Sequence, residues 1–414
     1  MPHIYINEKD NTVAGSVADN TNVVYIPGWK ESGGDIADNT PTAFFNTAAF
    51  LKSITGSETG NISAANTGAL MARELISLGM VVLYESFGAK GGNGVPASED
   101  AIAKAVKWDK LSDRGLYKVK FLTCGATSAM VKASNEDDYV SKKMLACAAK
   151  RGDAIALIDH EKTITASSNK TIAETIYDKF TTVGIKTDEN AKYGAAFSPW
   201  CKFNIGTSTK GLELPGSFAF LSAFAKSTQS NPNWYAAAGF FRGKIPSIIA
   251  PLYTFGDADC AVLQARKFNS DGSFVSDDNT GLAVNPISNI ESAGFIIWGN
   301  RTLTPNNTGL TASSFLNIRN LCCDVKKTIY KAARKYTFEQ NNDILWGNFC
   351  SEITPLLDKA LSGNGIRGYR LIQRPTTVRG RLSAIIRIIP IEAVEDFDLT
   401  VEMTDSLETV SEGI

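Results

Sequence analysis

The sequence predicts an α/β fold of mixed α+β character, with a mixed sheet flanked by helices and an extended β-strand arm at each end of the chain. Three times in the first half, a helical pattern, a glycine or polar turn and an apolar strand follow one another. The apolar strands are expected at residues 81–84, 117–122 and 154–158. This alternation is typical of a largely parallel sheet with helices on its faces. At 414 residues, of which 43% are hydrophobic, the chain is long enough for two or three domains with a sizeable core.

The first half begins with two short extended segments, 3–6 and 23–26, and the second is expected to stop at Pro27-Gly28. A polar loop over 30–40 follows. The helical patterns in this half span residues 42–54, 64–78 and 137–150. Met144, Leu145 and Ala148 are expected to turn inward from the third of these helices.

The segment 202–286 is dense in Gly, Pro, Asn and Ser, which predicts long loops and one helix near 217–226. An apolar strand is expected at 294–298, followed by a strong amphipathic helix over 315–336. The polar face of that helix is basic, and its residues include Lys326, Lys327, Lys331 and Arg334. A further helix begins near Asp343, with a restart at Pro355 capped by Thr354.

Near the carboxyl end, 384–389 predicts a strand buried on both faces. The last strand pattern alternates, with apolar side chains on one side and polar ones on the other. Its apolar side carries Phe397, Leu399, Val401 and Met403. Charge is also separated here, because 366–387 holds six arginines and no acid, whereas 388–414 holds eight acids and no Lys or Arg. These stretches are either two independently solvated segments or complementary surfaces that meet within one subunit or between subunits.

Composition excludes several classes of function. The net charge is −1, so nothing favours a nucleic-acid partner, and only two histidines, His3 and His160, are available for a metal or catalytic site. Seven scattered cysteines without a CxxC pair predict reduced, core-packed thiols. No signal peptide and no membrane-spanning stretch are expected, and the glycine-rich loop at 88–96 lacks a phosphate-binding motif.

One segment allows an enzymatic interpretation. Asp159 and His160 follow a buried strand, at the end of a sheet where α/β enzymes place their ligands. Adjacent residues of a strand point to opposite faces, however, and no GxSxG elbow is present to supply a nucleophile. A strand-end turn is therefore the preferred interpretation, and an α/β enzyme with a site at these two residues is the alternative.

Ten segments together resemble contractile tail sheath proteins, which form the outer sleeve of phage tails and related injection machines. The most specific is Ile297-Trp298-Gly299-Asn300-Arg301-Thr302-Leu303, which is similar to a VWGxRTL motif. The others, in chain order, are 2–8, 21–28, 193–200, 214–217, 233–243, 285–287, 317–321, 338–342 and 365–369. Their order and spacing extend over most of the chain, except for residues 30–140.

The resemblance implies a structural polymer, without catalytic residues, cofactor or metal. Sheath subunits assemble as six-fold rings stacked helically around an inner tail tube protein, meet baseplate and tail terminator proteins, and contract to drive the tube through a target envelope. They neither bind nucleic acid nor insert into a membrane. The expected location is a virion tail or an injection particle assembled in the bacterial host cytoplasm, where the chain is made.

The resemblance also implies a division of the chain and a set of contact residues. Residues 1–29 form the amino-terminal arm and first core strand, 30–305 the sheath-type body, 306–391 a carboxyl-terminal domain and 392–414 an acidic arm. A lone terminal strand with one apolar face needs a sheet to join, which a neighbouring subunit can supply. The expected arm residues are Ile4, Tyr5, Ile6, Phe397, Leu399, Val401 and Met403. Charged interface candidates are Lys326, Lys327, Lys331, Arg334, Glu395, Asp396, Asp398 and Glu402.

Overall fold

The computed structural model describes residues 22–132, 138–166, 169–205, 209–265, 282–291, 293–305, 310–375, 377 and 380–395. Its central element is a six-stranded sheet in the order β2-β3-β1-β4-β5-β6. Strands β3, β1, β4, β5 and β6 run parallel, and the short edge strand β2 is antiparallel to β3. The predicted mixed α/β fold with a largely parallel sheet is confirmed. The strands are β1 (Val23–Lys30), β2 (Thr42–Phe44), β3 (Val81–Ala89), β4 (Phe121–Leu122), β5 (Ile155–Leu157) and β6 (Gly194–Ala195).

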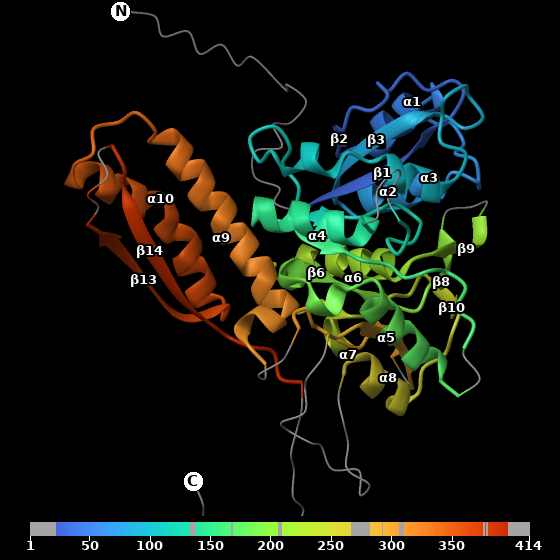
Figure 1. The fold of residues 1–414 in the computed structure, drawn as a ribbon. Helices are drawn as coiled ribbons and strands as arrows, with labels where there is room; N and C mark the ends of the chain where they lie inside the picture. The colour runs from blue at the N-terminus through green and yellow to red at the C-terminus, as the bar shows by residue number, and fades with distance from the viewer. Residues whose placement is uncertain are drawn as a thin grey trace, which may run out of the picture.

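Helices cover both faces of this sheet (Figure 1). Successive residues of one strand alternate between the two cores, as Val24 and Tyr25 of β1 do. One face packs against α1 (Thr47–Thr55), α2 (Thr67–Ser77) and α6 (Gly216–Ser230). The other packs against α3 (Glu99–Ala105), α4 (Val140–Arg151) and α5 (Ile172–Thr182). Met144, Leu145 and Ala148 of α4 are fully buried, as predicted.

Three sequence predictions in the first half are wrong in detail. The strand expected over 117–122 is limited to Phe121–Leu122. Strand β1 does not stop at Pro27-Gly28 but continues to Lys30. Beyond Tyr25 only β3 pairs with it, so Pro27 lies where one strand edge is open. The helix expected over 42–54 is also shorter, because Thr42–Phe44 forms β2 and the Asn46 side chain then caps α1.

The segment 202–286 holds more regular structure than predicted. The expected helix is confirmed as α6. Short strands replace much of the expected loop, and some of its Asn and Gly residues, such as Asn204 and Gly211, lie within them. They build two three-stranded sheets, ordered β10-β8-β9 and β12-β11-β7. The further elements are β7 (Phe197–Ser198), β8 (Cys201–Ile205), β9 (Thr209–Leu214), α7 (Gly239–Arg242), β10 (Ile248–Pro251), α8 (Asp257–Leu263), β11 (Asn285–Ile290) and β12 (Gly294–Ile297).

The last elements form a separate layer beside the body, with α9 nearest to it (Figure 1). This carboxyl-terminal unit consists of α9 (Leu316–Lys335), α10 (Asp343–Ser362), β13 (Ile366–Arg374) and β14 (Ser383–Pro390). Helix α10 continues through Pro355 without a restart. The Thr354 hydroxyl donates to the carbonyl of Cys350 and does not cap a new helix. Pro355 lies on an exposed face, where water can replace the missing backbone N–H donor. Strand β14 is not buried on both faces, since helices cover only one of them.

Among the described residues, no helix is both long and apolar enough to span a membrane. Five of the seven cysteines are buried, in agreement with their predicted core packing.

Candidate assembly surfaces

The carboxyl-terminal unit carries a sheet that is too narrow for the helices beneath it. Strands β13 and β14 pair only with each other within the described chain. Two strands span about 10 Å, whereas two packed helices span about 20 Å. The sheet packs on α10 through β13, with Tyr369 donating to Asp358 at 2.6 Å, and α9 stays partly uncovered. No further strand among the described residues covers this part of α9.

An apolar groove lies where the sheet leaves α9 uncovered. It runs between α9 and β14 as two cavities, of about 550 and about 240 Å³. Ile329 and Ala333 of α9 face Ala384 and Ile386 of β14 in the larger cavity. Ile318 and Cys322 face Ile388 in the smaller one. The groove therefore follows the open edge of β14 along most of its length.

The basic face of α9 divides into two parts. Lys326 and Lys327 are half-buried at the junction with the body, where the Lys326 Nζ lies 5.4 Å from the centroid of the Tyr193 ring. Burial, reinforced by the nearby Lys120 ammonium, lowers the pKa of Lys327 to about 8. Lys331 and Arg334 are exposed further along the helix. Solvent exposure on this face is therefore greater in its second half.

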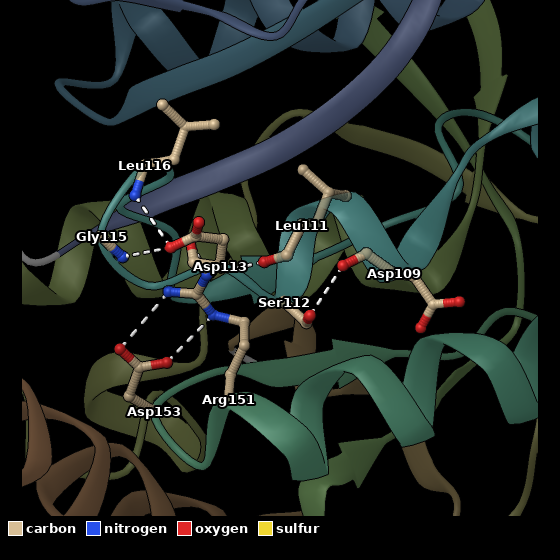
Figure 2. A network of polar contacts seen from close by, with 8 residues as sticks. All are labelled: Asp109, Leu111, Ser112, Asp113, Gly115, Leu116, Arg151 and Asp153. Atoms are coloured by element: carbon tan, nitrogen blue, oxygen red, sulfur yellow. Dashed lines mark hydrogen bonds and ion pairs between the residues drawn. The ribbon is translucent and has the colours of Figure 1, made fainter.

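A buried arginine holds the body loop on which α9 rests (Figure 2). Arg151, at the end of α4, pairs with Asp153 with Nε and Oδ1 3.0 Å apart. It also donates to the carbonyl of Leu111 at 2.7 Å, at the end of a 3₁₀ turn. The following loop is closed by Asp113, which accepts from the amide of Gly115 at 2.8 Å. Arg114 of this loop stacks over the Tyr330 ring of α9, so the network positions one side of the junction.

A buried ion pair joins α9 to the body. Lys120, fully buried at the start of β4, places its Nζ 3.0 Å from Oδ1 of Asp324 in α9. Asp324 also accepts from Asn233 at 3.1 Å, and the Asn22 side chain donates to Asn233 at 3.2 Å. Asn22 directly precedes β1. The start of β1 is therefore linked to α9 by consecutive polar contacts.

A second ion pair holds the root of the carboxyl-terminal arm. Glu395 accepts from the Arg301 Nε at 2.7 Å, and both side chains are largely buried. The Arg301 guanidinium also lies 4.8 Å from the centroid of the Phe315 ring. The chain leaving β14 is therefore attached to the body before it continues into residues 396–414.

Asp159 and His160 occupy a closed polar turn. Asp159 accepts from the amide of Ser217 at 3.0 Å and from its hydroxyl at 2.5 Å, which caps α6. The His160 Nε2 lies 2.9 Å from the Ser198 hydroxyl. Burial raises the pKa of Asp159 to about 7 and lowers that of His160 to about 4. Both side chains are fully buried, and their hydrogen bonds go to different serines.

The other predicted contact residues cannot be placed. Residues 1–21 and 396–414 lie outside the described part of the chain. They include Ile4, Tyr5, Ile6, Asp396, Phe397, Asp398, Leu399, Val401, Glu402 and Met403. Within the described ranges, no group of three or more His, Cys, Asp and Glu side chains could hold a metal ion.

Neither ion pair is predicted from the sequence. Lys120 carries a signal for the first, because it interrupts an apolar strand pattern and a buried lysine needs an acidic partner. Its partner lies 204 positions later, which local spacing does not reveal. Arg301 belongs to the segment 297–303, which contains no acidic residue that could indicate its partner.

Comparisons with known proteins agree with this architecture. No family model matches the chain. A tail sheath protein of Vibrio phage KVP40 is 26% identical over 187 residues, which cover 45% of this chain and 23% of that relative. The PVC sheath complex of an extracellular contractile injection system, in the contracted state, superimposes with a TM-score of 0.63 at 17% identity. That match covers 99% of this chain and 98% of the PVC chain.

Two anti-feeding prophage structures, the baseplate and the contracted helical sheath, each give a TM-score of 0.57 at 14% identity. They cover 98% and 97% of this chain, respectively, and 99% of the matched chain in both cases. The chain therefore has the fold of contractile sheath subunits along nearly its whole length.

Proposed function

We propose that this chain is the structural subunit of a contractile sheath, which polymerises as stacked rings or a helix around an inner tube and contracts to drive the tube through a target envelope. The observation that carries the proposal is the likeness to the PVC sheath chain, which covers 99% of this chain and 98% of that one. Neighbouring copies of this chain are its main partners. An inner tube, a baseplate and a terminator protein are further partners of the same particle, whether a phage tail or an injection system.

In this proposal, arms from neighbouring subunits complete the narrow sheet of the carboxyl-terminal unit. The strand 397–403 of one subunit adds to the open edge of β14 in the next, and its apolar side chains fill the groove over α9. The amino-terminal strand at 4–6 takes the open edge of β13. Such a contact is heterologous, so it repeats along a helix or ring stack instead of closing as a dimer.

The arms allow this polymer to change shape without separating into subunits. Contraction requires rigid parts that rotate relative to one another while the chains stay linked. The body and the carboxyl-terminal unit are the rigid parts, and the arms are the links. The exposed Lys331 and Arg334 are our candidates for contacts that change during contraction, together with acidic residues of the arm. The energy is stored during assembly, so the proposed subunit needs no nucleotide.

The enzymatic alternative has less support. Asp159 and His160 are buried and bonded to Ser217 and Ser198, respectively, which accounts for both residues as structural groups. The sheath-like fold favours a non-enzymatic role, although a fold alone does not define chemistry.

The proposal is tested by assembly of the purified full-length chain. We expect tubes or ring stacks in negative-stain electron microscopy, without added nucleotide or metal. A chain that stays monomeric across a wide range of salt and protein concentrations would overturn the proposal.

A further inference from the structure

The outer face of the β13–β14 sheet, which points away from the helices, is basic. Arg370 of β13 lies directly opposite Arg387 of β14 in the antiparallel register. Arg374 lies on the same face four residues after Arg370, opposite Ser383. All three arginines are exposed. We refer to Arg370, Arg374 and Arg387 as the arginine face.

This arrangement is unfavourable in an isolated subunit. Like charges directly opposite one another destabilise a strand pair. None of the three arginines forms an ion pair with a described residue, so the repulsion is not offset within that part of the subunit. The same face carries Ile372, which is paired with Ile385, and also Ile389, of which 60% is exposed. A sheet face that carries arginines and isoleucines can pair its cations with the acidic side chains of a neighbouring strand.

The opposite face of the sheet has a different character. Tyr369 and Leu371 of β13, with Ile386 and Ile388 of β14, point toward the helices and pack on their core. A strand added beside β14 continues both faces, because side chains alternate along every strand. An added strand must therefore be apolar on one side and acidic on the other.

Residues 397–403 have this pattern. Phe397, Leu399, Val401 and Met403 would turn toward the groove. Asp398 and Glu402 alternate with them and would emerge on the side of the arginine face. The amino-terminal segment at 4–6 carries no acidic residue, so it offers this face no charge partner.

We propose that the arginine face is the specificity determinant for assembly: it selects the acidic carboxyl-terminal strand of a second copy of this chain and sets its register beside β14. This inference rests on the proposed function, because it assumes that the arm joins a neighbouring sheet. It adds which arm binds at β14 and which charges decide the pairing.

The test uses two full-length charge-reversal variants. The first, Arg370→Glu/Arg387→Glu, has an acidic sheet face and the native acidic arm. The second, Asp398→Lys/Glu402→Lys, has the native sheet face and a basic arm. In a polymer of either variant alone, the arm and the sheet face that it meets carry charges of the same sign. We therefore expect the critical concentration for assembly to rise about tenfold or more. Sedimentation and electron microscopy measure this concentration.

Mixing the two variants in equal amounts should restore assembly. The basic arm of the second then meets the acidic face of the first, and the acidic arm of the first meets the native face of the second. Polymers should contain both variants in alternation. A control variant, Lys52→Glu/Lys150→Glu, makes the same charge change at exposed lysines of the body and should assemble normally, with no rescue by the basic arm.

Three outcomes would overturn the inference. Normal assembly of both variants would show that the arginine face does not select the arm. Rescue by combining all four substitutions in one chain, but not by mixing, would place the contact within one subunit. Failure of the mixture, with each variant folded by circular dichroism, would show that the charges do not pair. If the sheet-face variant is misfolded, the neutral variant Arg370→Gln/Arg387→Gln replaces it. Its assembly should then lose the salt dependence shown by the native chain, and an unchanged salt dependence would overturn the inference. Assembly of the unmodified chain tests the proposed function separately.

Discussion

Arg301 and Glu395 join two distant parts of the chain at the root of the carboxyl-terminal arm, with the Arg301 Nε 2.7 Å from Oε2 of Glu395. Arg301 follows β12 in the body, and Glu395 follows β14 in the carboxyl-terminal unit. The pair holds the end of the described chain, five residues after β14, against the body.

The first prediction removes this attachment. Glu395→Gln keeps a hydrogen-bond acceptor but removes the charge opposite a largely buried guanidinium, so the free energy of unfolding should fall by about 1–3 kcal/mol. Chemical denaturation of the unassembled subunit measures this change. Glu392→Gln, three residues earlier at an exposed position, is the matched control and should change it by less than about 0.5 kcal/mol. Equal effects of the two substitutions would contradict the role of the ion pair.

The second prediction concerns the junction beneath α9. Lys120→Met leaves the buried Asp324 carboxylate without its main cation and should cost about 3–5 kcal/mol of unfolding free energy. Adding Asp324→Asn removes the unpaired charge and keeps an acceptor for Asn233, so the double variant should recover part of the loss. Denaturation curves of both variants measure the difference. No recovery in the double variant would indicate that packing of the lysine stem, rather than charge pairing, stabilises the junction.

How far the sequence predicts this molecule depends on the range of the interactions. The parallel sheet and helices α4, α6 and α9 follow from local periodicity, which each segment carries by itself. The strands in 201–251 are not evident from local periodicity, because they are short and β10 pairs with β8 across α6 and α7. The Lys120–Asp324 and Arg301–Glu395 pairs join positions 204 and 94 residues apart, so only the folded chain reveals them.

The third prediction is a pH dependence that isolates His160. Its pKa in the fold, about 4, lies below the ordinary 6.5, so folding favours the neutral imidazole. That stabilisation is present above pH 6.5 and is lost as the pH falls from 6.5 toward 4. The stability advantage of the native chain over His160→Gln should therefore shrink across this range, by on the order of 3 kcal/mol in total.

Thermal or chemical unfolding of both proteins from pH 7 to pH 4.5 measures that difference. Asp159 is common to the two proteins, so its own titration, whose raised pKa opposes this trend, cancels. Assembly at pH 7 should persist in any His160→Gln protein that folds. Complete loss of assembly in a fully stable variant would point to a functional role for this turn.

The fourth prediction places a charged side chain in the groove. Ala333 is an exposed residue of α9 that lines the larger cavity, so Ala333→Glu puts a carboxylate where the apolar side of an arm is proposed to lie. The isolated subunit should keep its melting temperature, because glutamate is a good helix former at an exposed site. Polymer formation should be strongly reduced in sedimentation assays. Ser351→Glu, at an exposed position of α10, is the control that should still assemble; equal assembly of both variants would argue against the groove as an arm site.

Deletion of residues 396–414 tests most directly whether the arms link neighbouring subunits into a sheath. The deletion keeps Glu395 and removes four apolar side chains, whose burial is worth about 1.5–3 kcal/mol each before ordering costs. If the arm joins a neighbour, the truncated chain keeps the thermal melting transition of the unassembled full-length subunit but forms no tubes in negative-stain electron microscopy. A truncated chain that still forms long tubes, or that is insoluble or molten because the strand belongs to its own core, would contradict the account.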